Sequence, residues 1–110
     1  MLKPPLPANE ARRLEVLDQC QILNTAPEKA FDDIARLAAY IAQTPIALVS
    51  LIDSERQWFK AKVGLAAPET HRDLAFCAHA ILQTDILVVP DAFADDRFAD
   101  NSLVRLTAHE

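Results

Sequence analysis

Glycine, cysteine and long apolar runs are scarce in this sequence of 110 residues. Its one glycine, Gly64, excludes a glycine-rich phosphate-binding loop. The two cysteines, Cys20 and Cys77, stand far apart, so they form neither a CxxC motif nor a disulfide framework. No apolar run approaches the ~20 residues of a membrane-spanning helix, and residues 1–7 lack the apolar core of a signal peptide. We therefore expect a cytoplasmic protein without a membrane span or a metal site.

The net charge and the length of the chain further limit which kinds of protein this can be. The formal net charge of −5 argues against general nucleic-acid binding, which usually needs a basic surface. With 51% hydrophobic and 25% charged residues, the composition is that of an ordinary globular protein, and the length suits one domain. We expect residues 1–8 to be a disordered proline-rich lead and residues 9–110 to be the domain.

Two helices are predicted in the first half of the chain. Residues 9–23 have a broad apolar face with Asn9 as a possible cap. Either this helix packs on the domain, with Cys20 as a small core residue, or it pairs with a second copy of itself. A capping box of Thr25 and Glu28 predicts a second helix that ends near Gln43. Its expected buried face contains Phe31, Ile34, Ala35, Ala38, Ile41 and Ala42.

Two strands are predicted next. Residues 46–52 form a short apolar run rich in branched side chains, which is typical of a central strand. Residues 56–63 alternate, so Trp58, Lys60 and Lys62 are expected on a solvent-facing side. A tight antiparallel turn joins the two strands, and Gly64 ends the second. Residues 65–72 are predicted to be a loop.

The second half of the chain predicts a helix over residues 74–83, capped by Asp73, and a third strand over residues 86–89. Residues 91–101 are expected to form a loop with one short helical turn. Helices and strands in this order indicate an α+β fold with a small sheet.

Cys77 and His79 are the first candidates for a catalytic nucleophile and its base. Residues two apart on a helix point about 200° away from each other, so they do not form a nucleophile–base pair. Cys77 shares a stripe with Ile81, which indicates a buried, inert thiol, although a thiol near a helix N-terminus can also be reactive. His79 is either a hydrogen-bonded structural residue or a ligand contact. No catalytic motif appears in the sequence.

Acidic and aromatic residues follow the third predicted strand. The spacing of Asp91, Asp95, Asp96 and Asp100 does not match a calcium-binding EF-hand loop. Asp91 directly follows the predicted strand, so its carboxylate is expected at a sheet end, where pockets form. Arg97 and Phe98 lie close enough in sequence to close the same pocket.

Several segments, in order and over residues 9–104, resemble the bacterial GAF domain family. They are residues 12–28, 31–35, 45–53, 56–61, 63–65, 76–81, 88–92 and 96–98. The resemblance implies a sheet of about six antiparallel strands, helices on both sides, and a pocket between the sheet and its crossover segments. It also implies a sensory role in signal transduction, beside the output domain of a two-component histidine kinase, a diguanylate cyclase or a phosphodiesterase. The implied ligand-binding residues are Phe76, Cys77, His79, Asp91, Arg97 and Phe98, together with Ser50 and Phe59 if their face of the sheet looks inward.

The chain departs from the family pattern in two ways. Bilin-binding relatives attach their chromophore to a cysteine followed at once by histidine, whereas Ala78 separates Cys77 from His79 here, so no bilin is expected. The family also continues with the last strands of its sheet, and residues 105–110 do not resemble that continuation. We expect a sheet that lacks those strands and a homodimer that pairs sheet edges or helices.

Three functions follow from these interpretations. The first is a non-enzymatic sensory module that binds a small molecule, relays signals through a dimer, or both. The second is an interaction module whose pocket is filled by its own side chains. The third is a thiol enzyme that reduces free methionine sulfoxide, which requires Cys20 and Cys77 to approach each other or a substrate.

Overall fold

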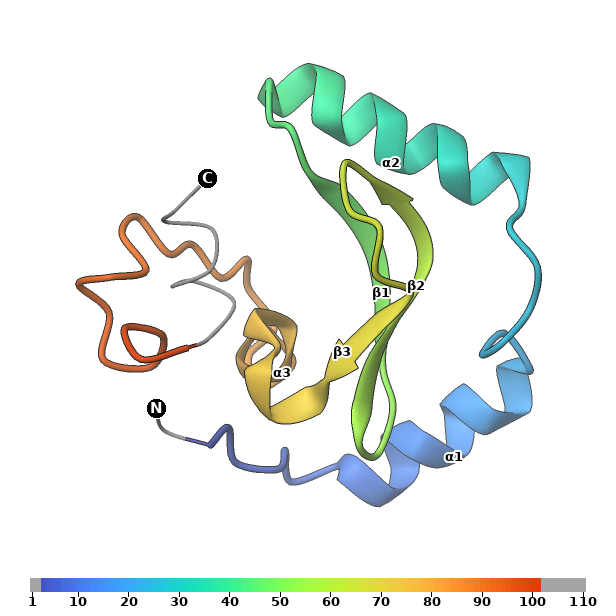
Figure 1. The fold of residues 1–110 in the computed structure, drawn as a ribbon. Helices are drawn as coiled ribbons and strands as arrows, with labels where there is room; N and C mark the ends of the chain where they lie inside the picture. The colour runs from blue at the N-terminus through green and yellow to red at the C-terminus, as the bar shows by residue number, and fades with distance from the viewer. Residues whose placement is uncertain (1–2, 102–110) are drawn as a thin grey trace.

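A computed structural model describes residues 3–101, and these residues form an α+β fold, as predicted. The elements are α1 (Glu10–Cys20), α2 (Lys29–Ala42), β1 (Ala47–Ile52), β2 (Arg56–Val63), β3 (Glu69–His71), a 3-10 helix η1 (Arg72–Leu74) and α3 (Phe76–Ala80). The three strands form an antiparallel sheet in the order β1-β2-β3. Figure 1 shows α2 and α3 on opposite sides of the sheet, with α1 near the turn between β1 and β2.

The predicted antiparallel pair of β1 and β2 is confirmed. Ile52 lies opposite Gln57, and the turn closes with a hydrogen bond of 2.8 Å from the Asp53 amide to the Arg56 carbonyl oxygen. β1 is not the central strand of the described sheet, however, because β2 lies between β1 and β3. An apolar run favours a covered strand, but it does not show which strands flank it, and in β1 only Ile52 is buried.

Of the three residues predicted on a solvent-facing side of β2, Lys62 is exposed, but Trp58 and Lys60 are buried. The register passes from Val49 opposite Ala61 to Ser50 opposite Phe59, so Lys60 is the extra residue of a β-bulge. A strand with a bulge no longer keeps a strict alternation of faces.

Buried Lys60 is paired with the segment between α1 and α2. Its Nζ donates to Thr25 Oγ1 and to the Ala26 carbonyl oxygen, each at 2.7 Å, and forms an ion pair of 2.6 Å with Glu28. A charge is tolerated at such a site when every donor has a partner. The predicted capping box is therefore absent: Thr25 contacts Lys60, and Glu28 is the N-cap residue of α2 without a side-chain cap.

Two predictions about the helices are also wrong. α1 contains no buried residue, and Cys20 is exposed rather than part of the core. On α2 only Ala35 is buried, while Ile34 and Ile41 are exposed. The helical spacing identified an apolar stripe correctly, but a stripe does not show whether another element covers it.

The region after β2 differs most from the prediction. The expected loop 65–72 contains β3, and the expected helix 74–83 is a turn of 3-10 helix followed by the five residues of α3. Ala75, not Asp73, is the N-cap residue of α3. Residues 86–89 form no strand, and Ile86 and Val88 are largely exposed. Branched apolar residues favour strands, but a strand also needs a neighbour with which to pair.

Residues 91–101 form turns, including a helical one in which the Asp95 carbonyl oxygen accepts from the Phe98 and Ala99 amides at 2.9 and 2.8 Å.

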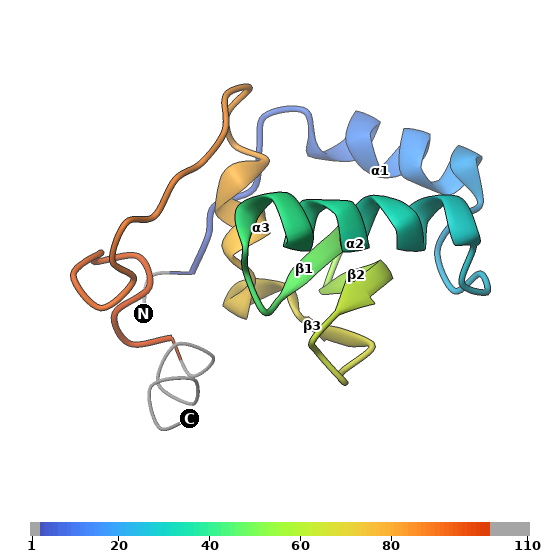
Figure 2. The ribbon, with the colours of Figure 1, turned by 90° about the horizontal axis from the view of Figure 1, so that it is seen from above.

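In the proline-rich lead, Pro4 is buried. A small core of Ile52, Ala75 and Ala78 joins β1 to α3. Figure 2 shows the same arrangement from above. No helix within residues 3–101 has the length and apolar character needed to cross a membrane.

Candidate functional site

The candidate site lies where α3 packs on β1. Ser50 and Phe59 are cross-strand partners, and such partners lie on the same face of a sheet. The Ser50 hydroxyl donates to Cys77 Sγ at 3.4 Å, so this face carries α3. Cys77 and Ile81 both pack against the core of Ile52, Ala75 and Ala78, which confirms their predicted common stripe.

An aromatic cluster holds residues 91–101 against α3. The rings of Phe76 and Phe98 stack with centroids 4.0 Å apart, and His79 meets the Phe98 ring edge-on at 4.9 Å. Phe98 is only 1% exposed. The Asn101 side chain adds a hydrogen bond of 2.8 Å to the Leu74 carbonyl oxygen. Phe98 therefore fills the space beside Phe76 and His79.

Charge at the edge of this cluster is balanced within the segment itself. Arg97 donates from Nε and Nη2 to the two carboxylate oxygens of Asp95, at 3.0 and 2.7 Å, and its guanidinium lies 5.1 Å from the Phe98 ring centroid. These bonds lower the pKa of Asp95 to about 2. Burial, with a smaller contribution from Arg97, lowers the pKa of His79 below its usual value. At neutral pH the site therefore presents a neutral His79 imidazole beside an arginine that is already paired with Asp95.

The structure brings most of the predicted site residues together. Ser50, Phe59 and Cys77 lie on or against one face of the sheet, and Phe76, His79, Arg97 and Phe98 form the adjoining cluster. Asp91 is different. It is exposed, and its carboxylate accepts a hydrogen bond of 3.0 Å from the Phe93 amide. Asp91 does not follow a sheet strand, because residues 86–89 pair with none.

A hollow of about 480 Å³ adjoins the site between α1, β1 and α3. Both cysteines line it, but α1 ends at Cys20 on the side away from α3 in both views (Figures 1 and 2). We refer to this space as the α1–α3 hollow; its lining is Arg13, Val16, Leu17, Cys20, Ser50, Leu51, Ile52, Cys77, Ala80 and Ile81.

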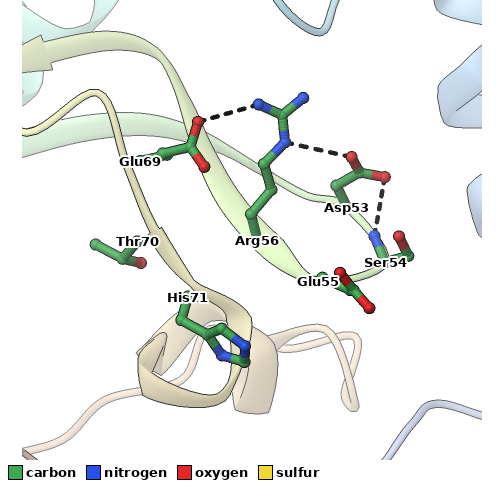
Figure 3. Close-up of a pocket in the computed structure, with 7 residues that line it drawn as sticks. All are labelled: Asp53, Ser54, Glu55, Arg56, Glu69, Thr70 and His71. Atoms are coloured by element: carbon green, nitrogen blue, oxygen red, sulfur yellow. Dashed lines mark hydrogen bonds and ion pairs between the residues drawn. The ribbon is translucent and has the colours of Figure 1, made fainter.

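A second, polar hollow of about 390 Å³ lies beside the β1–β2 turn (Figure 3). Arg56 lies between two carboxylates, 3.4 Å from Asp53 and 3.1 Å from Glu69. The arginine neutralises these acids, so they are not free to hold a cation. Residues 3–101 contain no cluster of three or more side chains suited to a metal ion.

Arg72 is a buried residue that no pattern in the sequence had marked as a site residue. It is 4% exposed and forms an ion pair of 2.6 Å with Glu10, which lies in α1. The two residues are 62 positions apart, so no local spacing relates them. A charged residue in a predicted loop is usually solvent-exposed, and only its contacts in the fold show otherwise.

Comparison with known proteins agrees with this fold. The model of the GAF domain family matches residues 26–109. The chain is 42% identical over 105 residues to the cyclic di-GMP phosphodiesterase PA2567 of Pseudomonas aeruginosa, and the match covers 96% of this chain. It covers 18% of that relative, so the chain spans about a fifth of the relative's length. The family match extends over most of the chain and includes the sheet, α3 and the aromatic cluster, and the chain therefore belongs to the GAF domain family.

Proposed function

We propose that this chain is the regulatory module of a signalling protein and that the catalytic output lies in a separate domain. Membership of the GAF family supports a regulatory role. The relative is a cyclic di-GMP phosphodiesterase, and only 18% of it corresponds to this chain. A phosphodiesterase is therefore the first output domain to consider, before the diguanylate cyclase or histidine kinase that the family resemblance also implies.

The module binds a small molecule at the face between β1 and α3. The observation that supports this best is the position of Phe98, which joins residues 91–101 to α3 by stacking on Phe76. A molecule that enters beside Ser50 and Cys77 would displace α3 and, with it, the Phe76 ring on which Phe98 stacks. Binding would then change the balance between a packed and a released segment, by as much as the ligand's affinity for the two states differs.

Native mass spectrometry of the purified chain, followed by thermal-shift screening of small metabolites that include cyclic di-GMP, tests this proposal. We expect a bound mass or a stabilising ligand. Ser50→Leu, which fills the space beside Cys77, should abolish binding. Ser54→Leu is the matched control, because Ser54 is exposed in the β1–β2 turn. If no compound binds the wild-type chain, or if Ser50→Leu leaves binding unchanged, the ligand site is wrong.

Dimerisation is a second candidate function, and the outer face of α2 favours it. Tyr40 and Ile41 are 81% and 70% exposed, and Ile34 and Leu37 extend the same stripe. Monomeric proteins rarely expose large contiguous apolar patches, so such a patch indicates an interface. We propose that a second copy of the chain covers this face.

Light scattering on wild type, on Ile41→Lys and on the control Glu15→Lys tests the dimer. Ile41→Lys places a charge in the apolar stripe, whereas Glu15 lies on the exposed side of α1. We expect a dimer for wild type and the control and a monomer for Ile41→Lys. A wild-type monomer at every concentration would exclude this function.

A further inference from the structure

We propose that the ion pair between Glu10 and Arg72 couples α3 to α1, so that displacement of α3 loosens the attachment of α1 to the domain. Through this coupling, a ligand bound between β1 and α3 would change the position of α1. Only this link to a ligand rests on the proposed function. The ion pair itself can be tested on the chain without a ligand.

α1 is attached to the domain by few contacts. None of its residues is buried. The α1–α3 hollow lies on one side of α1. A different hollow, of about 400 Å³, separates Leu14, Leu17 and Asp18 of α1 from Asp53 and Arg56. A helix without buried side chains gains little from apolar packing, so its position depends on its polar contacts.

Those polar contacts gather at the N-terminal end of α1. The carboxylate of Glu10 accepts from both Nη atoms of Arg72, at 2.6 and 3.0 Å, and from Arg13 at 2.6 Å. Arg13 also donates to the Ile52 carbonyl oxygen at the end of β1. The hydrogen bond from Arg72 is the main reason that the pKa of Glu10 is lowered to about 2.

Arg72 belongs to the segment that leads into α3. It is part of η1, its carbonyl oxygen accepts from the Ala75 amide at 3.0 Å, and α3 begins at the next residue, Phe76. The Arg72 side chain also donates to the Asp53 carbonyl oxygen at 3.1 Å. A shift of α3 therefore moves the backbone that carries the guanidinium.

The same segment is joined to residues 91–101. Leu74 of η1 accepts the Asn101 hydrogen bond, and Phe76 at the start of α3 stacks on Phe98. A continuous set of contacts thus runs from Phe98 through η1 to Arg72 and Glu10. Because Arg72 is only 4% exposed, its guanidinium is costly to leave without the carboxylate partner, so the pair resists separation while α1 and η1 keep their places. Coupling between two elements acts equally in both directions, so weakening the pair at Glu10 must also loosen α3.

Of the two cysteines in the chain, only Cys77 is partly buried, so alkylation of Cys77 reports on α3. Cys77 lies on α3, half-buried, with Ser50 as its hydrogen-bond partner, and Cys20 is exposed on α1. The rate at which iodoacetamide alkylates Cys77 measures how often α3 moves away from β1. Hydrogen exchange of the α1 amides measures the attachment of α1, and exchange of the α2 amides measures global stability.

The test compares Glu10→Gln with Glu15→Gln. Glu15 is a matched control, because it lies on the same helix and pairs with Arg12 on the surface at 3.0 Å. For Glu10→Gln we expect α1 exchange and Cys77 alkylation each to rise about tenfold or more, since the buried Arg72 guanidinium has lost its charged partner. Exchange in α2 should stay as in wild type, and Glu15→Gln should change neither quantity.

Three results would overturn the proposal. Faster α1 exchange with unchanged Cys77 alkylation would mean that the pair holds α1 without coupling it to α3. An equal rise in α1 and α2 would mean a global loss of stability, and no change in either would mean that the pair has no effect. If Glu10→Gln does not fold, Glu10→Asp, which keeps the charge but shortens the reach, should give a smaller rise in both quantities. Failure to find a ligand would leave these outcomes unaffected.

Discussion

Replacement of Phe98 by alanine is the sharpest test of how residues 91–101 are held. Phe98 is 1% exposed and stacks on Phe76 at 4.0 Å. Truncation of a buried phenylalanine to alanine usually costs about 3–5 kcal/mol. We expect about 3 kcal/mol for Phe98→Ala, the lower end, because a segment without regular structure can move to fill part of the space. This is a large fraction of the ~5–15 kcal/mol that stabilises a typical domain.

Urea unfolding followed by tryptophan fluorescence measures this cost. The chain has one tryptophan, Trp58, and it is buried in β2, so its emission reports on the sheet. A fall in the midpoint with an unchanged slope gives the loss in free energy directly.

Phe93 provides the matched control. It lies in the same segment but is 52% exposed, so Phe93→Ala should change stability by less than about 0.5 kcal/mol. If Phe98→Ala costs less than about 1 kcal/mol, or no more than Phe93→Ala, the stack does not hold the segment to the sheet and the reasoning fails.

Three further predictions concern single positions. Gly64→Ala should lower the unfolding free energy by more than about 1 kcal/mol, because Gly64 has φ +76° and a Cβ there would lie 2.0 Å from the Pro45 carbonyl oxygen; equal stability in urea would contradict this. The free energy of unfolding should fall as the pH drops through 6.5, because the pKa of His79 is lowered in the folded chain and the unfolded chain binds the proton more readily. A His79→Gln variant with the same pH dependence as wild type would show that His79 is not the cause. Stability should also fall as the pH drops from 4.5 to about 2, because the pKa of Glu10 is lowered in the folded chain and the unfolded chain therefore takes up the proton first. Thermal unfolding of Glu10→Gln should show a weaker dependence on acid pH than wild type. An unchanged pH profile would contradict the role of Glu10.

Local patterns predicted the parts of the fold that depend on neighbouring residues. The apolar run of β1, the turn at Asp53 and the following alternation were sufficient for the β1–β2 pair. The single glycine marked the end of β2, because its positive φ is a property of the residue itself. Most of the candidate site was likewise found in sequence, since Cys77, His79 and Phe98 lie in segments that resemble the GAF family.

Patterns failed where burial depends on distant parts of the chain. Lys60 reads as a solvent-facing residue, yet it is buried because the segment between α1 and α2 supplies oxygen partners. Residues 86–89 have the composition of a strand and form none, because composition does not provide a neighbouring edge. Phe93 and Phe98 are the same amino acid five positions apart, and only the fold places one in the solvent and the other in a stack.

The sequence by itself determined the α+β class, the family, the antiparallel β1–β2 pair and the approximate positions of α1 and α2. These follow from periodicity and backbone preference, which act over a few residues. Only the tertiary structure decided that β2 is the centre of the described sheet, that the apolar stripe of α2 is uncovered, and that Arg72 pairs with Glu10. Each of these features depends on whether two distant segments meet in space. The free energy of such a contact depends on both segments, so neither local sequence predicts it alone.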